Sequence, residues 1–552
     1  MVLLTQEFLN NYPSHPEHMS PLGLFTFYRT YSRFLPKEKR RETWKETVAR
    51  AISYNVGLQA IHQEKNGLPA REKWLREEAE KLFDNVFNLR QFPSGRTLFV
   101  GGTAITDNFP MANFNCSFTN FSKWSDLREL FYLLMLGSGV GIKATKETMK
   151  DLPPIRTNAT LILSEYKPVP NDYRLEHTDT RFLENGFAKI YVGDSKEGWC
   201  DSLNWYIRLL TDPKYENIHT IKISFNSVRP AGERLKTFGG TASGPEPLRE
   251  MFQGIDDTLK NKIDTTLAPI KIDEKGYGYV RPIHILDMAN FIGANVVVGG
   301  VRRTAEIFLF DAHDQEVLFA KYGKNGFWTP DHIAQHREVG KQMDKLGIKR
   351  PAWFDHIGSA NYNPMIDERI KALKHRSMSN NSIVFLQQPP KEYLHLIFQL
   401  IKLDAEPGFV NFEQASTRRE NMQGLNPCAE ILLDSKQQCN LTTINMMAFL
   451  KEDGTLDIPK LHEAQELSVR AGIRMTLVDL EMPEWDKIHK RDRLTGCSLT
   501  GIQDALAKFT NGERREILTD LNHIANEEAV FYAHALRIPT PLLVTTVKPE
   551  GS

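Results

Sequence analysis

The chain has 552 residues, of which 41% are hydrophobic and 25% are charged, as is usual for a globular protein. Its 69 lysine and arginine residues balance its 69 aspartate and glutamate residues, so no overall field indicates nucleic acid or an anionic membrane as a partner. There is no run of about 18 apolar residues and no basic-then-apolar leader. We therefore expect a cytoplasmic protein.

The first elements are predicted to be helical. Residues 1 to about 90 place apolar residues three to four positions apart among charged ones. A loop is then predicted at Phe92–Thr97, followed by an extended segment that reaches residue 102. Alternating polar and apolar residues at Asn113–Phe118 predict a strand that carries Cys116.

The middle of the chain begins with an apolar helix at Leu127–Leu136, which ends at the glycine cluster Gly137–Gly141. A dinucleotide-binding fingerprint needs a strand before its glycines and a helix after them. The order here therefore favours a tight turn that lines a nucleotide site. From 151 to 290 the composition becomes rich in proline, asparagine and turn residues, which is typical of an inserted or regulatory module.

The last part of the chain alternates short apolar runs with longer amphipathic ones. The short runs predict strands at 296–298, 307–310 and 382–386, and the longer runs predict helices at 391–402, 464–480 and 513–535. A further apolar strand is predicted at Pro541–Val547. This alternation favours an α/β fold with a substantial parallel sheet.

The strongest chemical signal is Asn426–Glu430, with the sequence Asn-Pro-Cys-Ala-Glu, followed by Cys439. The carboxylate can move a proton, one thiol can carry a radical or act as a nucleophile, and the other can supply reducing equivalents. Cys200 and Cys497 are interpreted as small buried hydrophobic residues. No two cysteines have the C-x-x-C spacing, and no metal site is predicted.

These residues resemble the catalytic chain of ribonucleotide reductase. Other stretches fit the same family in the same order: Pro93–Arg96, Gly137–Gly141, Asp194–Trp199, Gly232–Thr241, Gly299–Ile307 and Thr545–Gly551. The resemblance is nearest to the adenosylcobalamin-dependent, monomeric ribonucleoside-triphosphate reductases. The segment at Asp194–Trp199 and the long module between Cys116 and Cys428 are typical of that class.

The resemblance implies a ten-stranded α/β barrel of the ribonucleotide reductase type, with the radical cysteine on a central finger loop. It implies four regions: an N-terminal helical region at 1–90, the start of the catalytic barrel at 91–150, an inserted effector-binding module at 151–290, and the rest of the barrel at 291–552. It also implies adenosylcobalamin as the cofactor and the radical source.

The resemblance assigns a role to each residue of the site. Cys428 is the thiyl radical that takes the 3′ hydrogen of the ribose, and Glu430 draws the proton from the 3′-hydroxyl. Asn426 holds the sugar hydroxyls by hydrogen bonds. Cys116 and Cys439 supply the reducing equivalents and end as a disulfide.

The resemblance also implies binding sites for a ribonucleoside triphosphate and for a deoxynucleotide effector. Glycine-rich turns suit phosphates, and the substrate phosphates are expected at Pro93, Ser94, Gly95, Gly551 and Ser552. The effector is expected at Asp194, Ser195, Glu197, Gly198, Trp199, Gly299, Gly300, Val301, Arg302 and Arg303.

The sequence stops at Ser552, inside a predicted phosphate-binding loop, and no cysteine follows Cys497. We therefore expect a barrel that is incomplete at its carboxyl end and works with a C-terminal companion fragment and thioredoxin or a similar dithiol; the chain alone is expected to be inactive. Two alternatives stay open: the catalytic chain of a ribonucleoside-diphosphate reductase with another radical source, or a non-catalytic nucleotide-binding fragment. A thiol-dependent hydrolase is disfavoured because no motif places one of the 16 histidines near Cys428.

Overall fold

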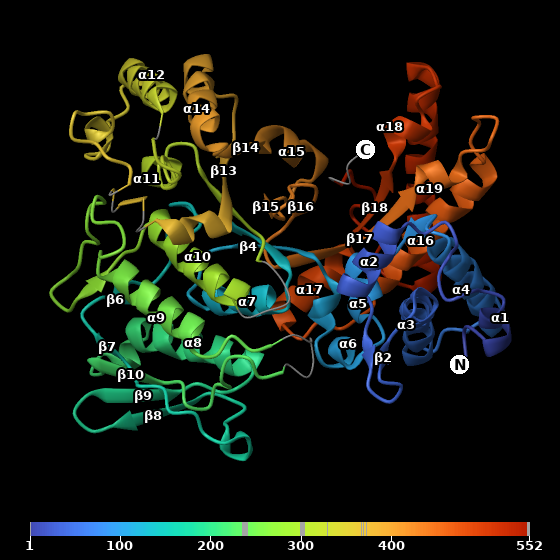
Figure 1. Cartoon of the computed structure of the whole chain (residues 1–552), viewed down its shortest axis with the longest axis horizontal. Coiled ribbons are helices and arrows are strands. Elements are labelled where there is room, and N and C mark those ends of the chain that lie inside the picture. The colour runs from blue at the N-terminus through green and yellow to red at the C-terminus, as the bar shows by residue number, and fades with distance from the viewer. Residues whose placement is uncertain are drawn as a thin grey trace. The chain divides into compact units, whose positions relative to one another are not determined.

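The structure is a computed structural model that describes residues 2–234, 241–298, 304–327, 329–365, 367, 369–370 and 373–548. The chain forms two compact units, which are shown with their elements in Figure 1. The first unit comprises Met1–Ser117, Cys428–Ile431 and Lys436–Ser552, and the second comprises Phe118–Pro427 and Leu432–Ser435. Among the described residues, no helix combines the length and the apolar character needed to span a membrane.

The first unit begins with four helices: α1 Gln6–Asn10, α2 Pro21–Thr30, α3 Trp44–Lys65 and α4 Glu72–Phe87. Helix α3 starts with a capping box in which Thr43 and Glu46 each bind the other's backbone N–H. Its apolar face packs on α4 in a shared core. The helical pattern predicted for this stretch is therefore confirmed. A two-residue hairpin, β1 Phe34–Leu35 with β2 Arg40–Arg41, lies between α2 and α3.

The loop and extended segment predicted from Phe92 to residue 102 are wrong. Strand β3 Gln91–Phe92 leads into helix α5 Gly95–Val100. The Ser94 hydroxyl caps this helix by accepting a hydrogen bond from the Thr97 backbone N–H at 3.1 Å. The apolar side chains of α5 are buried, and this burial stabilises a short helix where the local pattern indicated none. Helix α6 Ala104–Asn108 follows.

The rest of the first unit is a small sheet covered by helices. Strands β17 Gln437–Asn445 and β18 Thr495–Thr500 are parallel, and β3 pairs with β17 in the antiparallel sense. The helices are α16 Ile458–Met475, α17 Pro483–Asp492, α18 Ile502–Ala505 and α19 Asn511–Leu536. Helices α16 and α19 pack together, and both contribute to the cores of this unit.

The strand predicted at Pro541–Val547 is present only as a single β-bridge. This segment runs beside β18, and Val544 accepts a backbone hydrogen bond from Cys497 at 2.7 Å. The bridge joins Cys497 and Thr545. Pro541 has no N–H group to donate, which limits how far a ladder can extend.

The second unit contains a parallel sheet in the order β14 Gly408–Asn411, β13 Ser379–Phe385, β12 Glu306–Asp311 and β5 Gly139–Lys143. Strand β4 Cys116–Asn120 runs across the boundary between the units. The strands predicted at 307–310 and 382–386 are confirmed. The helices are α7 Ser125–Met135, α10 Pro282–Val298, α11 Gln315–Leu318, α12 Pro330–Leu346, α14 Lys391–Asp404 and α15 Phe412–Arg418.

The strand predicted at 296–298 is wrong, because this valine run forms the last turn of α10. Valine favours strands when nothing else decides the backbone. Here the run continues a long apolar helix that packs between α9 Glu246–Leu259 and α7. Tertiary packing therefore overrides the local propensity.

The predicted inserted region contains a sheet of its own, in the order β7 Thr160–Leu163, β10 Thr220–Ser224, β9 Phe187–Tyr191 and β8 Asp179–Leu183. Helix α8 Lys196–Thr211 contacts β9, and α9 contacts β7. A second small pair is formed by β6 Ile155–Arg156 and β11 Tyr277–Gly278. Figure 1 shows this sheet beneath helices α8 and α9.

Candidate active site

The central motif lies at the tip of a short hairpin. Strands β15 Gly424–Leu425 and β16 Leu432–Leu433 pair in the antiparallel sense, and the residues between them form the tip. Ala429 has a φ of 60°, which is unusual for a residue with a side chain. Such conformations tend to occur where a fold needs a specific side-chain direction. The tight turn thus presents Cys428 and Glu430 on either side of Ala429.

The base of this hairpin packs on β5 through a glycine. A Cβ atom on Gly141 would lie 1.8 Å from the backbone oxygen of Leu425 and 2.9 Å from the ring of Phe118. The hairpin therefore needs a residue without a side chain at position 141. The interpretation of Gly137–Gly141 as a turn is wrong from Gly139 onward, because strand β5 begins there.

The structure brings one distant thiol to the motif carboxylate. Cys116 Sγ lies 3.8 Å from Glu430 Oε1 and can donate a weak hydrogen bond to it. Cys439 is fully buried on β17, and its Sγ lies 3.2 Å from the backbone oxygen of Asn440. Both cysteines are in the thiol form and not in a disulfide, as is the exposed Cys428. Asn426 is buried. It belongs to the second unit and lies one residue before Pro427, where that unit's part of the hairpin ends.

The pKa of the Cys428 thiol is raised above its ordinary value. Partial burial is the largest cause, and the negative charge of Glu430 adds to it. The Lys548 ammonium acts in the opposite direction and lowers this pKa. The net shift keeps Cys428 in the neutral S–H form at physiological pH. A neutral thiol suits transfer of a hydrogen atom better than nucleophilic attack, which needs the thiolate.

Three further polar residues lie at this centre, and one of them, Lys548, belongs to the terminal segment that the sequence suggests for phosphate binding. Thr546 Oγ1 donates a hydrogen bond to the backbone oxygen of Glu430 at 2.8 Å. Lys548 Nζ donates to Thr443 Oγ1 at 2.8 Å. The terminal family-like segment that contains Thr546 and Lys548 was recognised, but no pattern in it shows which backbone or hydroxyl group each side chain meets.

The expected phosphate residues Pro93, Ser94 and Gly95 lie in the first unit, beside β17. The register pairs Phe92 with Thr443, so the chain passes from this pair directly into Pro93. Pro93 and Ser94 are buried, and the Ser94 hydroxyl is engaged as the cap of α5. Gly551 and Ser552 lie outside the described residues.

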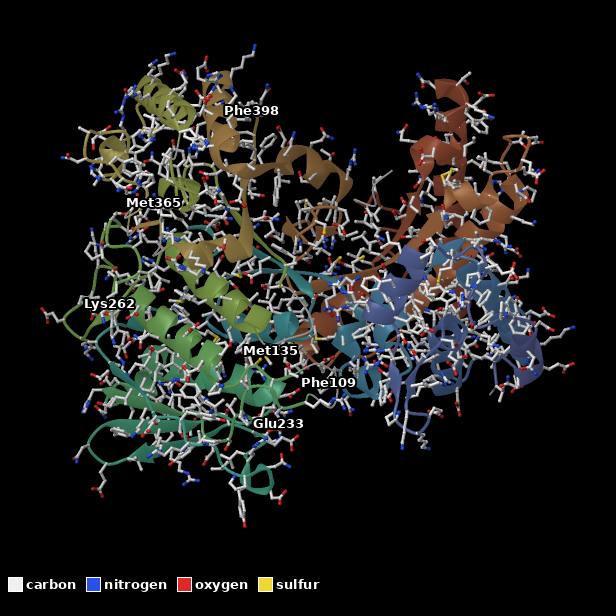
Figure 2. The ribbon with its side chains drawn as sticks, in the orientation of Figure 1. Phe109, Met135, Glu233, Lys262, Met365 and Phe398 are labelled. Atoms are coloured by element: carbon white, nitrogen blue, oxygen red, sulfur yellow. The ribbon has the colours of Figure 1, made fainter. Side chains whose placement is uncertain are left out.

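The expected effector residues at Asp194–Trp199 lie in the second unit, at the start of α8. Asp194 is ion-paired with Arg229 at 3.1 Å and with Arg174 at 3.6 Å. Arg174 also pairs with Glu233, labelled in Figure 2, at 2.8 Å. This arrangement fixes Asp194 among charges of both signs.

The first turn of α8 is built from the remaining described effector residues. Ser195 is its N-cap and accepts a hydrogen bond from the Gly198 N–H at 2.9 Å. A Cβ on Gly198 would lie 2.8 Å from Gly193, so the two glycines allow close backbone contact. Glu197 pairs with Lys196, and Trp199 is partly buried. Gly299, Gly300, Val301, Arg302 and Arg303 lie outside the described residues.

The remaining two cysteines, Cys200 and Cys497, are buried, as their interpretation as small hydrophobic residues requires. Burial raises the pKa of the Cys497 thiol to about 12. Burial also raises the pKa of Cys200 well above its ordinary value. Neither thiol is reactive in this state. No cluster of metal-ligating side chains is found among the residues that the structure describes.

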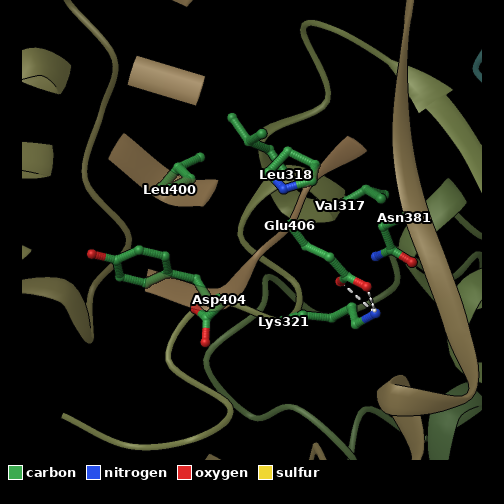
Figure 3. Close-up of a pocket in the computed structure, with 9 residues that line it drawn as sticks. Val317, Leu318, Lys321, Asn381, Leu400, Asp404 and Glu406 are labelled. Carbon is green, nitrogen blue, oxygen red and sulfur yellow. Dashed lines mark hydrogen bonds and ion pairs between the residues drawn. The ribbon is translucent and has the colours of Figure 1, made fainter. Parts of the chain in front are cut away.

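A small pocket in the second unit is lined by Val317, Leu318, Lys321, Tyr322, Asn381, Leu400, Asp404, Glu406 and Pro407. Figure 3 shows the ammonium of Lys321 pointing at the carboxylate of Glu406. Lys321 Nζ lies 2.7 Å from Glu406 Oε1. Burial lowers the pKa of Lys321 to about 8, although Glu406 opposes this shift. Lys321 also donates to the backbone oxygen of Ser379, so its ammonium links the start of β13 to Glu406, which lies just before β14.

The structure is that of an α/β protein in which the thiol of Cys116 meets the carboxylate of Glu430, two residues after Cys428. Three family profiles match the chain: "Ribonucleotide reductase alpha domain" at residues 4–103, "B12-dependent ribonucleotide reductase, insertion domain" at 172–259, and "Ribonucleotide reductase, barrel domain" at 221–513. The barrel profile alone covers more than half of the chain. The chain belongs to the ribonucleotide reductase family.

Known relatives agree with this assignment. The adenosylcobalamin-dependent ribonucleoside-triphosphate reductase of Lacticaseibacillus paracasei is 27% identical and covers 93% of this chain, which spans 65% of that protein. The reductase of the same name from Lactobacillus leichmannii is 26% identical and covers 100% of this chain, which spans 71% of it.

A crystal structure of a B12-dependent (class II) ribonucleotide reductase superposes with a TM-score of 0.76. It is 23% identical, and the match covers 100% of this chain and 76% of that one. The expected fold class, an α/β barrel of the ribonucleotide reductase type, is confirmed.

Proposed function

We propose that this chain reduces ribonucleoside triphosphates to 2′-deoxyribonucleoside triphosphates by a thiyl-radical mechanism, with adenosylcobalamin as the radical source. The observation that carries the proposal is the exposed, neutral Cys428 next to Glu430, whose carboxylate lies 3.8 Å from the buried thiol of Cys116. The names of the relatives and the matched B12-dependent insertion profile support the cofactor and the triphosphate.

The cofactor would supply the initial radical by homolysis of its cobalt–carbon bond. The arrangement of the cysteines fits this requirement, because Cys428 is exposed whereas Cys116 and Cys439 are buried. A radical source therefore has access to Cys428 and is kept from the other two thiols. Every later step belongs to the chain's own residues.

The proposed reaction begins when the Cys428 sulfur radical takes the hydrogen atom from C3′ of the ribose. Glu430 accepts the proton of the 3′-hydroxyl, and the 2′-hydroxyl leaves as water with a proton from Cys116 or Cys439. Asn426 holds the sugar hydroxyls in place. A displacement of about 1 Å at this stage would cost about 100-fold in rate.

Two electrons must then reach the sugar. Cys116 and Cys439 together release two electrons and two protons and become a disulfide. Cys428 returns its hydrogen atom to C3′, which restores the sulfur radical. The sum is one ribonucleotide and two thiols converted into one deoxyribonucleotide, one water and one disulfide. Thioredoxin or a similar dithiol would reduce that disulfide for the next turnover.

The nucleotide sites are part of the same proposal. We assign the substrate phosphates to Pro93, Ser94 and Gly95 with the terminal Gly551 and Ser552; in support, Phe92, which pairs with Thr443, leads directly into Pro93. We assign a deoxynucleotide effector to Asp194–Trp199 and Gly299–Arg303. We also keep the division into regions at 1–90, 91–150, 151–290 and 291–552 as part of this proposal.

The test uses the protein as purified from its source, with adenosylcobalamin, a ribonucleoside triphosphate and a dithiol. Cys428→Ser should abolish deoxynucleotide formation, while Cys200→Ala, which removes a buried thiol elsewhere, should retain it. Product formed by Cys428→Ser at the parent rate would refute the mechanism. Turnover that needs no adenosylcobalamin would instead indicate another radical source.

A further inference from the structure

Lys143 occupies an unusual position in the second unit. It is the last residue of β5, at the carboxyl end of a sheet whose strands β5, β12, β13 and β14 are all parallel. In α/β proteins, ligands bind outside the carboxyl ends of such strands. The side chain of Lys143 follows Gly141 on the same face of β5, and Gly141 faces the backbone of Leu425 on β15.

Lys143 differs from other partly buried lysines because no protein anion meets it. Lys321 pairs with Glu406, and Lys196 pairs with Glu197. Among the described residues, no carboxylate or carbonyl oxygen forms an ion pair or hydrogen bond with the Lys143 ammonium. Burial is the sole cause that lowers its pKa, to about 8.

The group that does contact Lys143 is aromatic. Its Nζ lies 5.4 Å from the ring centroid of Phe412. Phe412 is the first residue of α15, directly after β14, and β14 stands three strands away from β5. Three strand spacings amount to about 14 Å in a flat sheet. The contact therefore shows that α15 crosses over this end of the sheet and covers one side of the ammonium.

We propose that Lys143 binds a phosphate group of a ligand seated at the carboxyl ends of these strands. A half-buried ammonium with an aromatic ring on one side and no carboxylate is suited to an anion that arrives with the ligand. A protein anion would already have filled the position if the lysine served only to join two elements of the fold. A purely structural lysine would extend its ammonium into water.

The inference rests on the proposed function, which supplies two ligands that contain phosphate. One is the nucleotide substrate, with its triphosphate. The other is adenosylcobalamin, which contains a phosphodiester. Both present phosphate oxygens to an ammonium, and the experiment separates them with paired probes that differ in phosphate.

The experiment measures how fast the Lys143 amine reacts. Trace acetylation with acetic anhydride at pH 8 is followed by peptide mass spectrometry, and the exposed Lys402 on α14 serves as the internal reference. The four probes are cytidine triphosphate, cytidine, adenosylcobalamin and cobinamide, which lacks the phosphodiester. We expect at least tenfold protection of Lys143 by one phosphate-containing probe and none by its phosphate-free counterpart.

Two outcomes of this labelling would overturn the proposal. One is that no probe changes the reactivity of Lys143 relative to Lys402. The other is that each phosphate-free probe protects as well as its partner, because protection would then come from coverage and not from phosphate.

Variants give a second measurement. Lys143→Met should weaken binding of the protecting ligand about tenfold to 100-fold, as expected for a lost hydrogen bond to a charged group. Lys143→Arg should stay within about threefold of the parent, and Lys402→Met should match it. Equal affinity of Lys143→Met and the parent for both ligands would also overturn the proposal.

Neither measurement depends on turnover, so the two hypotheses can fail separately. Protection of Lys143 in a protein that forms no deoxynucleotide would sink the proposed function and leave the phosphate site. Normal formation of deoxynucleotide by a protein whose Lys143 is not protected would refute the phosphate site and leave the proposed function.

Discussion

Thr546 offers a direct test of how the site is positioned. Its hydroxyl donates a hydrogen bond to the backbone oxygen of Glu430 at 2.8 Å. Thr546→Val keeps the shape of the side chain and removes the donor. One hydrogen bond contributes about 1 kcal/mol, or about fivefold in an equilibrium, and a shift of about 1 Å in a reacting group costs about 100-fold in rate. We therefore expect kcat to fall between about fivefold and 100-fold, with KM little changed.

The neighbouring residue provides the matched control. Thr545 Oγ1 also donates one hydrogen bond, to Asn522 Oδ1 at 2.8 Å, but its exposed side chain lies away from Glu430. Both valine variants should lose about 1 kcal/mol or less of unfolding free energy. Deoxynucleotide formation is then assayed at saturating and limiting substrate. If Thr546→Val and Thr545→Val retain the same kcat, the hydrogen bond does not position Glu430 and the reasoning fails.

Three further changes follow from single features of the structure. Glu306 is buried without a hydrogen-bond partner among the described residues, and burial raises its pKa well above the usual value. Its contribution to stability is present below its unfolded pKa of about 4.3 and is lost as the pH rises through its folded pKa. Glu306→Gln should remove this pH-dependent loss of unfolding free energy. Urea titrations between pH 5 and 8 measure it, and a variant less stable than the parent at every pH would contradict us. Gly141→Ala would place a Cβ 1.8 Å from a backbone oxygen of the hairpin and should cost about 1–3 kcal/mol. Gly57→Ala on α3 meets nothing within 4 Å and should be neutral or stabilising by about 1 kcal/mol; equal melting temperatures for the two variants would refute the argument. Glu430→Gln should lower the pKa of the Cys428 thiol, because the carboxylate raises it. Iodoacetamide should then alkylate Cys428 faster at pH 7.5, and an unchanged or slower rate would exclude that electrostatic coupling.

Local patterns predicted most of the secondary structure in this chain but failed where tertiary contacts decide it. The helix predicted at 391–402 and the strand predicted at 307–310 both repeat their pattern over enough residues to be recognised. The valine run at 296–298 is short, and it continues helix α10, whose packing against α9 and α7 outweighs the strand propensity of valine. Helix α5 was missed because its cap, Ser94, follows a proline in what reads as a turn.

The sequence proposes the site as a set of residues, and it does not predict the geometry of that set. The Asn426–Glu430 motif suggests the proposed chemistry, because it places a cysteine and a glutamate two residues apart. The contact between Cys116 and Glu430 joins positions 314 residues apart, and no local pattern encodes it. The same holds for Lys143 and Phe412, whose meeting depends on how far the sheet curls. Such contacts depend on strand register and helix crossing, which only the folded chain shows.

The charges around Cys428 explain why one carboxylate can serve two purposes there. A hydrogen-atom donor must keep its S–H bond, so its thiol should remain neutral at working pH. Glu430 raises the pKa of that thiol, and the same negative charge is what a base for the 3′-hydroxyl needs. The Lys548 ammonium lowers the pKa of Cys428 and so opposes the effect of Glu430. The same ammonium also donates a hydrogen bond to Thr443, so part of its hydrogen bonding is directed away from Cys428. A cysteine nucleophile would need the opposite balance, with a cation as its nearest charged neighbour. The raised pKa of the Cys428 thiol thus favours the proposed hydrogen-atom transfer over hydrolysis by a thiolate.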